Sequence, residues 1–184
     1  MKNLKINKYL LIFLAVFNVL AVIYLAALSP VVGDLPGSVI STLPGDTTQI
    51  ANVRGYFTNQ TRNQVMAFYN SAYKGLFRIR LNHPPEKSKE IYVDTMQSYY
   101  LEEFVLPFKE TFYVNGFEWA NDVFTKPEKR IMNKLIYNDV VYNAKITTRV
   151  FPVSLPKRFA AFFLTEAAVV IVVYNIYLFL RKND

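Results

Sequence analysis

The chain contains no cysteine, and His83 is its only histidine. Without cysteine there can be no disulfide bond, thiol nucleophile, zinc knuckle or thiolate-bound iron–sulfur cluster. The missing cysteines do not fix the compartment, because a domain of this size can fold without disulfides. No motif in the sequence indicates a cofactor or a metal centre, and we expect neither.

The chain also lacks a concentrated block of positive charge, although its net charge is +7. Between residues 29 and 158 there are 16 lysines and arginines against 12 aspartates and glutamates, a balance of +4 with both signs scattered. A nucleic-acid binder gathers its positive charge on one face or stripe. The sequence therefore predicts no nucleic-acid partner.

Two long apolar runs stand near the ends of the chain. Residues 9–28 contain one strongly polar residue, Asn18, and residues 159–180 are interrupted by three polar residues, of which Glu166 is ionisable. A helix of about 20 residues at 1.5 Å per residue matches the roughly 30 Å hydrocarbon core of a bilayer. The runs predict two transmembrane helices, with the lipid bilayer as a partner.

A cleaved signal peptide is the alternative interpretation of the first run. The apolar region of a signal peptide is normally about 7–15 residues long, which is shorter than this run. The best small-residue cleavage site, Ala27 and Ser29, would place Pro30 directly after the cut. We interpret the run as an uncleaved anchor.

The positive-inside rule predicts the orientation, since basic residues near the ends of membrane helices favour the cytoplasm. Lys2, Lys5 and Lys8 precede the first run, and Arg181 and Lys182 follow the second. Two basic residues just before the second run weaken this bias without reversing it. We expect both termini in the cytoplasm and the central domain outside it.

The remaining segments divide by composition. Residues 29–48 hold three of the nine prolines and three of the six glycines, which is typical of a linker with little regular structure. The expected order is a tail at 1–8, a transmembrane helix at 9–28, a linker at 29–49, an α+β domain at 50–151, a second linker at 152–158, a transmembrane helix at 159–180 and a tail at 181–184.

Helical and strand patterns alternate in the central domain. Thr61 and Gln64 have the spacing of a capping box and predict the start of a helix that ends at Gly75. Alternating apolar and polar residues at 77–82 predict a half-buried strand. A second helix is predicted from Pro84 to about residue 107. Its apolar stripe consists of Val93, Met96, Tyr100 and Phe104.

Two hairpins and a last strand complete the domain. Asn115 and Gly116 lie between apolar segments and predict a tight hairpin turn, and Asn138 and Asp139 predict a weaker one. A short helix is predicted to begin within residues 125–128. Strict alternation over residues 142–150 predicts a strand. Hairpins with one polar face imply an antiparallel sheet covered by helices, so the predicted fold class is α+β.

Acidic residues on the second predicted helix are candidates for a cation site. Glu86, Glu90 and Asp94 lie four apart and would form one acidic stripe. We interpret it as a solvated helix face, because lysines interleave and no glycine-bearing calcium loop is present. Glu102 and Glu103 are adjacent, so on a helix they would not share a face and would not form an acid/base pair.

His83 is a weak catalytic candidate, because a general base there would need a carboxylate or nucleophile supplied by the fold. Asn59 and Thr61 match a glycosylation sequon, a motif that is common by chance. Several aromatic residues have the spacing of a packed core rather than of a stacking surface for sugars or bases. They are Tyr56, Phe57, Phe68, Tyr69, Tyr73, Tyr99 and Tyr100.

Glu166 is the most informative residue, since it lies on the order of 10 Å inside the second run at 1.5 Å per residue. Ionisable groups at such depth are unfavourable and usually face protein or water. One interpretation is a helix or subunit contact, or a protonatable site, with Tyr177 on the same face. Asn18 offers a second polar group for helix association. The alternative is that Glu166 snorkels toward the outer interface and Arg158.

The leading hypothesis is a membrane-anchored, non-enzymatic accessory subunit or scaffold. Its extracytoplasmic domain would contact a protein partner, either another membrane protein or a second copy of the chain. The alternative is an extracytoplasmic ligand-binding or sensory domain, which an apolar pocket lined by the tyrosines would favour. A third hypothesis is an enzyme acting on envelope or lipid substrates through His83 or carboxylates gathered by the fold.

Overall fold

A computed structural model describes residues 8–44, 46, 50–91 and 100–183 of the chain. The chain forms two compact units. One unit is Ser29–Pro152, and the other combines Met1–Leu28 with Val153–Asp184. The first unit contains the sheet, and the second contains the two long apolar helices.

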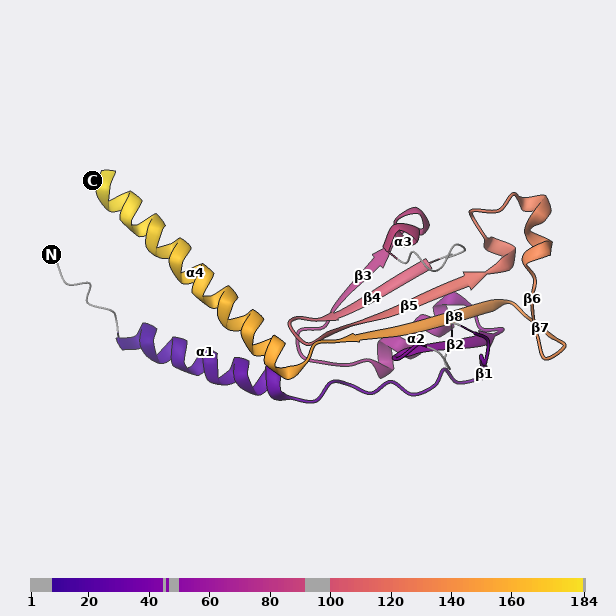
Figure 1. The fold of residues 1–184 in the computed structure, drawn as a ribbon, viewed down its shortest axis with the longest axis horizontal. Helices are drawn as coiled ribbons and strands as arrows, with labels where there is room; N and C mark the ends of the chain where they lie inside the picture. Colours follow the sequence, from indigo (N-terminus) through magenta and orange to yellow (C-terminus); the bar gives the residue numbers. More distant parts are fainter. Residues whose placement is uncertain (1–7, 45, 47–49, 92–99, 184) are drawn as a thin grey trace. The chain divides into compact units, whose positions relative to one another are not determined.

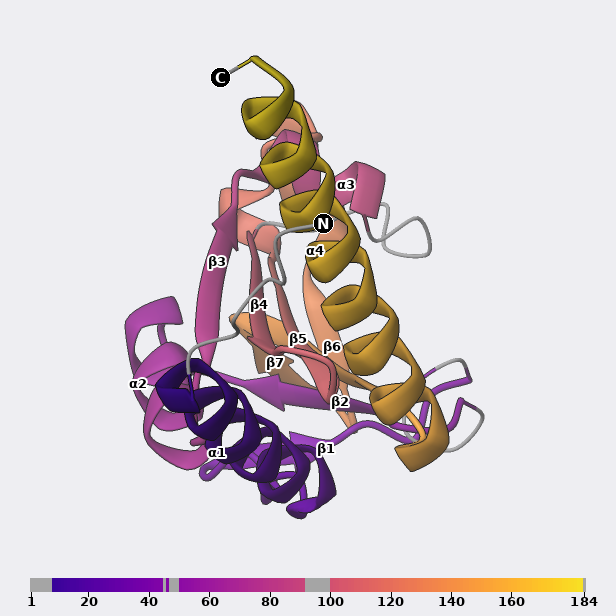
Figure 2. The same cartoon turned by 90° about the vertical axis from the view of Figure 1, so that its left-hand side faces the viewer.

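The larger unit is built on a six-stranded sheet with the order β1-β2-β8-β5-β4-β3 (Figure 1). All of its neighbouring strands are antiparallel. The strands are β1 (Ser38–Ile40), β2 (Val53–Thr58), β3 (Ile79–His83), β4 (Tyr100–Leu106), β5 (Glu110–Glu118) and β8 (Ala144–Pro152). The predicted α+β class with an antiparallel sheet is thus confirmed. The strand direction turns markedly from β3 to β2 (Figure 2), as the right-handed twist of strands requires.

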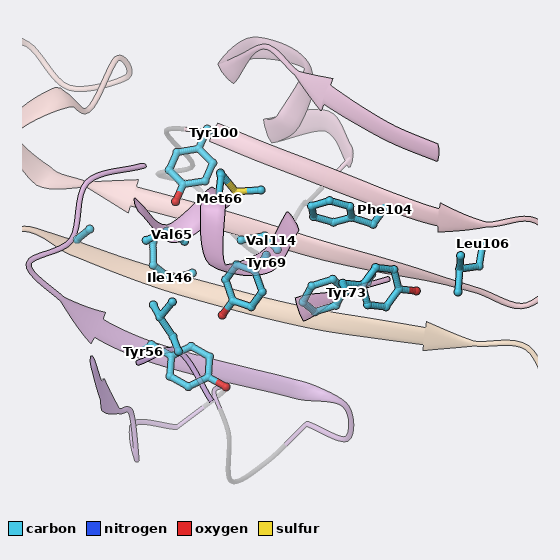
Figure 3. Packing of buried hydrophobic residues seen from close by; sticks show 13 residues of the cluster. Tyr56, Val65, Met66, Tyr69, Tyr73, Tyr100, Phe104, Leu106, Val114 and Ile146 are labelled. Carbon is cyan, nitrogen blue, oxygen red and sulfur yellow. The ribbon is translucent and has the colours of Figure 1, made fainter. Parts of the chain in front are cut away.

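Helix α2 (Arg62–Ala72) packs on one face of this sheet. It begins at the predicted capping box. The backbone amide of Gln64 donates to the Thr61 hydroxyl, and the backbone amide of Thr61 donates to the side-chain oxygen of Gln64. The core between helix and sheet is rich in aromatic rings (Figure 3). Its largest buried members are Tyr56, Tyr69, Tyr73, Tyr100 and Phe104.

The strand register separates two faces of the sheet. On the inner face, toward α2, Phe104 lies opposite Phe112, and Phe112 lies opposite Val150. On the outer face, the next pair along β4 and β5 is Glu103 opposite Tyr113. The inner face is therefore apolar at its centre, while the outer face carries polar side chains such as Glu103 beside buried apolar ones such as Leu101.

The predicted second helix is wrong at its C-terminal end. Helix α3 covers Pro85–Ile91, residues 92–99 lie outside the described residues, and Tyr100 and Phe104 lie on strand β4. The spacing of four that linked these two residues fits a helical face, but it is also two full periods of a strand. Both rings point to the inner face and are buried. Val93 and Met96, the other members of the stripe, lie outside the described residues.

The hairpin turn predicted at Asn115 and Gly116 is also wrong, because both residues lie inside β5. Gly116 has a packing role instead. It lies opposite Tyr100 in the register, and a Cβ atom on it would be 2.1 Å from Cε1 of that ring. The chain turns between β4 and β5 at Phe108, where φ is 61° and the Lys109 amide donates to the Leu106 carbonyl.

The other predicted hairpin is confirmed. Strands β6 (Leu135–Tyr137) and β7 (Val140–Tyr142) pair as a separate two-stranded sheet. Asn138 and Asp139 connect them with φ values of 49° and 61°, as a two-residue turn with positive φ at both positions requires. The predicted short helix nearby takes the form of a 3₁₀ segment, η2 (Pro127–Asn133), preceded by η1 (Trp119–Asn121).

The smaller unit contains α1 (Lys8–Ala26) and α4 (Leu155–Asn183). Both helices are long and apolar enough to cross a membrane. Nearly all of their apolar side chains are exposed, unlike those of a core helix in a soluble protein. Water would disfavour such extended apolar surface, so the exposure agrees with membrane helices.

The segments next to these helices contain some regular structure. Within the predicted linker 29–49, β1 pairs with β2, and Leu35 is buried in the core cluster. At the other end, β8 continues to Pro152 and α4 begins at Leu155.

We predict that Gly116→Ala lowers the free energy of unfolding by about 2–3 kcal/mol, because the added methyl group must displace the buried Tyr100 ring. Thermal and denaturant unfolding of the full chain in mild detergent would measure it. Gly33→Ala is the matched control, since a Cβ there meets no atom within 4 Å. Equal stability of the two variants would contradict the proposed role of Gly116.

Candidate functional site

Asn18 and Glu166, the two polar residues singled out in the apolar runs, meet in the structure. The Asn18 side-chain amide donates to Glu166 Oε1 at 2.8 Å and to the Leu14 carbonyl of its own helix at 3.0 Å. Asn18 lies about 12 Å from the end of α1 at Ala26, and Glu166 about 17 Å from the start of α4, at 1.5 Å per residue. The bond therefore joins the two helices well inside their apolar length.

Two further contacts accompany this bond. The Phe17 and Phe162 rings lie 6.0 Å apart between centroids. Arg158, toward which the alternative interpretation directs Glu166, donates from Nη1 to the Leu25 carbonyl near the end of α1 at 3.2 Å. Helix C-termini carry unpaired carbonyls, and a guanidinium stabilises them.

Tyr177 is not part of this contact. It is exposed on α4, about 17 Å further along the helix from Glu166 at 1.5 Å per residue. It lies on the same helical face as Glu166.

We predict that Asn18→Leu and Glu166→Leu each weaken the pairing of α1 with α4 by about 1 kcal/mol, the usual value of an interhelical hydrogen bond in a membrane. Membrane insertion should remain intact. Because the chain has no cysteine, one pair introduced at positions 17 and 162 would report the pairing by crosslinking in membranes.

The control is Asn175→Leu, since that amide donates to the Ile171 carbonyl of its own helix. This variant should crosslink as efficiently as the parent. Undiminished crosslinking in both Asn18→Leu and Glu166→Leu would show that the hydrogen bond does not hold the helices together.

His83 lies at the end of β3 with its Nε2 atom 2.9 Å from Glu103 Oε2. The Tyr113 hydroxyl donates to the other oxygen of Glu103 at 3.2 Å, and burial together with Glu103 raises the pKa of Tyr113 to about 12. The fold thus supplies the carboxylate that a histidine base needs. Neither of the two cavities described for the larger unit is lined by His83.

Glu102 points to the opposite, inner face and is 1% exposed. Its carboxylate accepts hydrogen bonds from Arg62 and Arg80, each at 2.9 Å, and from the Asn82 amide. Burial alone would raise the pKa of Glu102, but these three donors outweigh it and hold the pKa below its usual value. The two adjacent glutamates still do not pair, because neighbouring strand residues point to opposite faces.

We predict that Glu102 makes the fold sensitive to acid. Its folded-state pKa is lower than that of the unfolded chain, so its ionised form stabilises the fold at neutral pH, and this contribution is lost as pH falls below about 4.5. Glu102→Gln should lower the free energy of unfolding at pH 7 by about 2 kcal/mol, the usual size for a hydrogen bond to a charged group.

Unfolding measured at pH 7 and pH 3.5 would check this prediction. The stability gap between the parent and Glu102→Gln should narrow at the lower pH. A gap of constant size would mean that Glu102 does not contribute through its charge.

A cavity of about 530 Å³ opens into the inner side of the larger unit. We call it the tyrosine pocket. Its wall consists of segments 30–33 and 50–54, Tyr56, Tyr69, Tyr73, Phe112, Thr148, Val150 and Pro152. Its volume lies within the range of roughly 300–1,000 Å³ found for small-molecule sites.

The three tyrosine hydroxyls of this pocket differ in their partners. That of Tyr73 donates to Glu110 at 2.7 Å, and that of Tyr56 donates to Asp34 at 3.1 Å. Burial and Asp34 raise the pKa of Tyr56 to about 12. The Tyr69 hydroxyl is buried and has no hydrogen-bond partner within the described residues. Burial, and then Tyr56, raise the pKa of Tyr69, so its hydroxyl stays protonated and can donate.

Apolar side chains are exposed on a second surface, residues 119–143 between β5 and β8, which we call the β5–β8 insertion. This segment contains η1, η2, β6 and β7 and lies at the end of the sheet where β5 stops (Figure 1). Ile131 is 65% exposed and Met132 81% exposed. The same segment also exposes Val123, Phe124, Ile136, Val140 and Val141.

Polar and aromatic contacts hold the insertion in place. The buried Asp122 carboxylate accepts from the Phe124 amide at 2.9 Å and from Asn133 at 3.1 Å. The Tyr137 ring stacks on Phe57 of β2 at 4.5 Å between centroids. The exposed apolar side chains therefore stand on an ordered support.

The remaining candidates have simpler positions. Within residues 8–44, 46, 50–91 and 100–183, no three His, Asp or Glu side chains gather as a metal site. Glu86 and Glu90 are exposed on α3, and Asp94 lies outside the described residues. Asn59 of the sequon is exposed, while Thr61 serves as the cap of α2.

The sequence did not indicate the Glu102 cluster, the orphan hydroxyl of Tyr69 or the β5–β8 insertion as sites. The first two arise only when separate elements meet. The apolar residues of the insertion could have been noticed, since Ile131 and Met132 stand within a polar segment. No known protein family, characterised protein or solved structure matches this chain.

Proposed function

We propose that the chain is a membrane-anchored, non-enzymatic accessory subunit or scaffold that binds a protein partner through the β5–β8 insertion. The observation that carries this proposal is the exposure of apolar side chains on an ordered insertion, with Ile131 and Met132 the most exposed. Exposed apolar patches on soluble domains typically mark interaction surfaces, and methionine is enriched at interface cores.

The proposed topology places both termini in the cytoplasm and the domain outside it. The basic residues that flank the two apolar runs support this orientation. In this arrangement α1 and α4 anchor the domain, and the Asn18–Glu166 bond holds the anchors together. The partner is a protein with an accessible extracytoplasmic surface, either another membrane protein or a second copy of this chain.

We predict that the double variant Ile131→Asp and Met132→Asp abolishes the complex, because two charges would have to be buried at the apolar interface. The measurement is native mass determination after mild detergent extraction, with identification of the co-purifying chains. A multiple of the chain mass identifies self-association, and another mass identifies a different partner.

Leu76→Asp is the matched control. Leu76 is 73% exposed, but it precedes β3 and is not part of the insertion. The complex should persist in this variant. A strictly monomeric parent protein, or equal loss of the complex in both variants, would refute the proposed surface.

A ligand-binding domain is the second candidate function, and the tyrosine pocket favours it. The pocket combines apolar side chains with a few polar groups, among them the hydroxyls of Tyr56 and Tyr69, which is the arrangement expected of a small-molecule site. Enzyme activity has narrower support. The His83–Glu103 contact supplies an acid/base pair, but an adjoining cleft for a substrate is also required.

A further inference from the structure

The side chain of Tyr69 carries a buried hydroxyl group at the wall of the tyrosine pocket. Tyr69 is 1% exposed, and its hydroxyl has no hydrogen-bond partner among the described residues. Figure 3 shows the hydroxyls of Tyr69 and Tyr56 directed toward the same region. Both residues line the tyrosine pocket. Buried polar groups normally have a partner, so an acceptor is expected inside the pocket.

The pocket also limits the charge of its ligand. Arg54 is the single charged residue among the described lining residues, and its guanidinium pairs with Asp34. Asp34 in turn accepts from the Tyr56 hydroxyl. The positive and negative charges at the wall thus neutralise each other. A charged ligand would lose its hydration without gaining an opposite charge, so the pocket favours a neutral one.

Most of the remaining side chains of the wall are apolar, with Asn52 and Thr148 as polar exceptions. Val31, Val32 and Ile50 come from loops, and Phe112 and Val150 come from the sheet. Such a surface binds hydrocarbon by removing it from water. The ligand therefore combines an apolar body with one uncharged acceptor, such as a carbonyl oxygen.

The chain itself suggests the source of such a molecule. The lining residue Pro30 follows the end of α1 by four positions, and Pro152 precedes the start of α4 by three. At no more than about 3.6 Å per residue, the backbone keeps these two wall residues within about 14 Å and 11 Å of the helix ends. If the helices span a bilayer, neutral membrane lipids are the nearest abundant molecules with this chemistry.

We propose that the tyrosine pocket binds one acyl chain of a neutral, ester-bearing lipid, whose carbonyl oxygen accepts a hydrogen bond from the Tyr69 hydroxyl. This inference rests on the ligand-binding candidate described above and is independent of partner binding by the β5–β8 insertion. It names the ligand class and assigns Tyr69 the role of a binding residue.

The test uses the full chain in nanodiscs, with a photoreactive monoacylglycerol as the probe and mass spectrometry to locate the labelled peptides. Labelling should fall on segments 30–33 and 50–54 and saturate with probe concentration. Tyr69→Phe should weaken binding about tenfold, the value of one hydrogen bond of ordinary strength. Val32→Trp, which fills the pocket from its apolar side, should abolish it.

A stability measurement separates binding from a structural role. Without probe, Tyr69→Phe should be at least as stable as the parent, because it removes an unpaired buried hydroxyl. Clear destabilisation would show that the hydroxyl has a structural partner and would overturn the inference. Tyr113→Phe, which removes a hydroxyl from the outer face, is the control and should bind the probe as the parent does.

Competing probes distinguish the remaining outcomes. A photoreactive fatty acid, which carries a negative charge, should bind at least tenfold more weakly than the monoacylglycerol. Equal or tighter binding of the fatty acid would overturn the neutral-lipid inference while leaving a ligand-binding role standing. If neither lipid probe labels the pocket but a water-soluble phenyl ketone does, the neutral-lipid inference is overturned and the ligand-binding role remains. Failure of all three would refute the ligand-binding role as well.

Discussion

The packing of α2 on the inner face of the sheet is the interaction on which the other features of the domain depend. It places the Tyr73 ring 4.9 Å from that of Phe112 and 5.8 Å from that of Phe104. The first residue of the helix, Arg62, reaches Glu102, so the aromatic core and the buried charge cluster share one support. The same helix supplies Tyr69 to the wall of the tyrosine pocket. Loss of this packing would expose the rings and remove one cation from a buried carboxylate.

Two buried polar groups on the inner face differ in their hydrogen bonding. Glu102 is satisfied by two guanidinium groups and an amide, so its charge is stable in the interior. Tyr69 lies on the same side of the sheet, yet its hydroxyl has no partner in the described part of the chain. The three donors around Glu102 show that polar groups in this interior can be well hydrogen-bonded. Because buried polar groups normally have a partner, the Tyr69 hydroxyl is the group for which we propose a ligand.

Local signals in the sequence were reliable where the structure is local. The Thr61–Gln64 cap, the Asn138–Asp139 turn and the alternation of β8 each depend on residues close in the chain. The Asn115–Gly116 signal failed because β5 continues through both residues and pairs with β4 and β8, which only the tertiary fold reveals. Asn18 and Glu166 were recognisable as unusual polar residues, but their mutual hydrogen bond was not predictable from 148 residues of separation. The Glu102 cluster likewise combines three elements that no short pattern connects.

The order of the strands makes the attachments of α1 and α4 to the sheet mechanically unequal. Two residues separate α4 from β8, a strand bonded to neighbours on both sides. Eleven residues separate α1 from β1, a three-residue strand at the edge of the sheet. A force applied along α4 is therefore resisted by the backbone hydrogen bonds of β8 to both β2 and β5. A force applied along α1 is resisted first by the apolar contacts of Val32 and Leu35 with the core. Under load the domain would yield first at its N-terminal attachment.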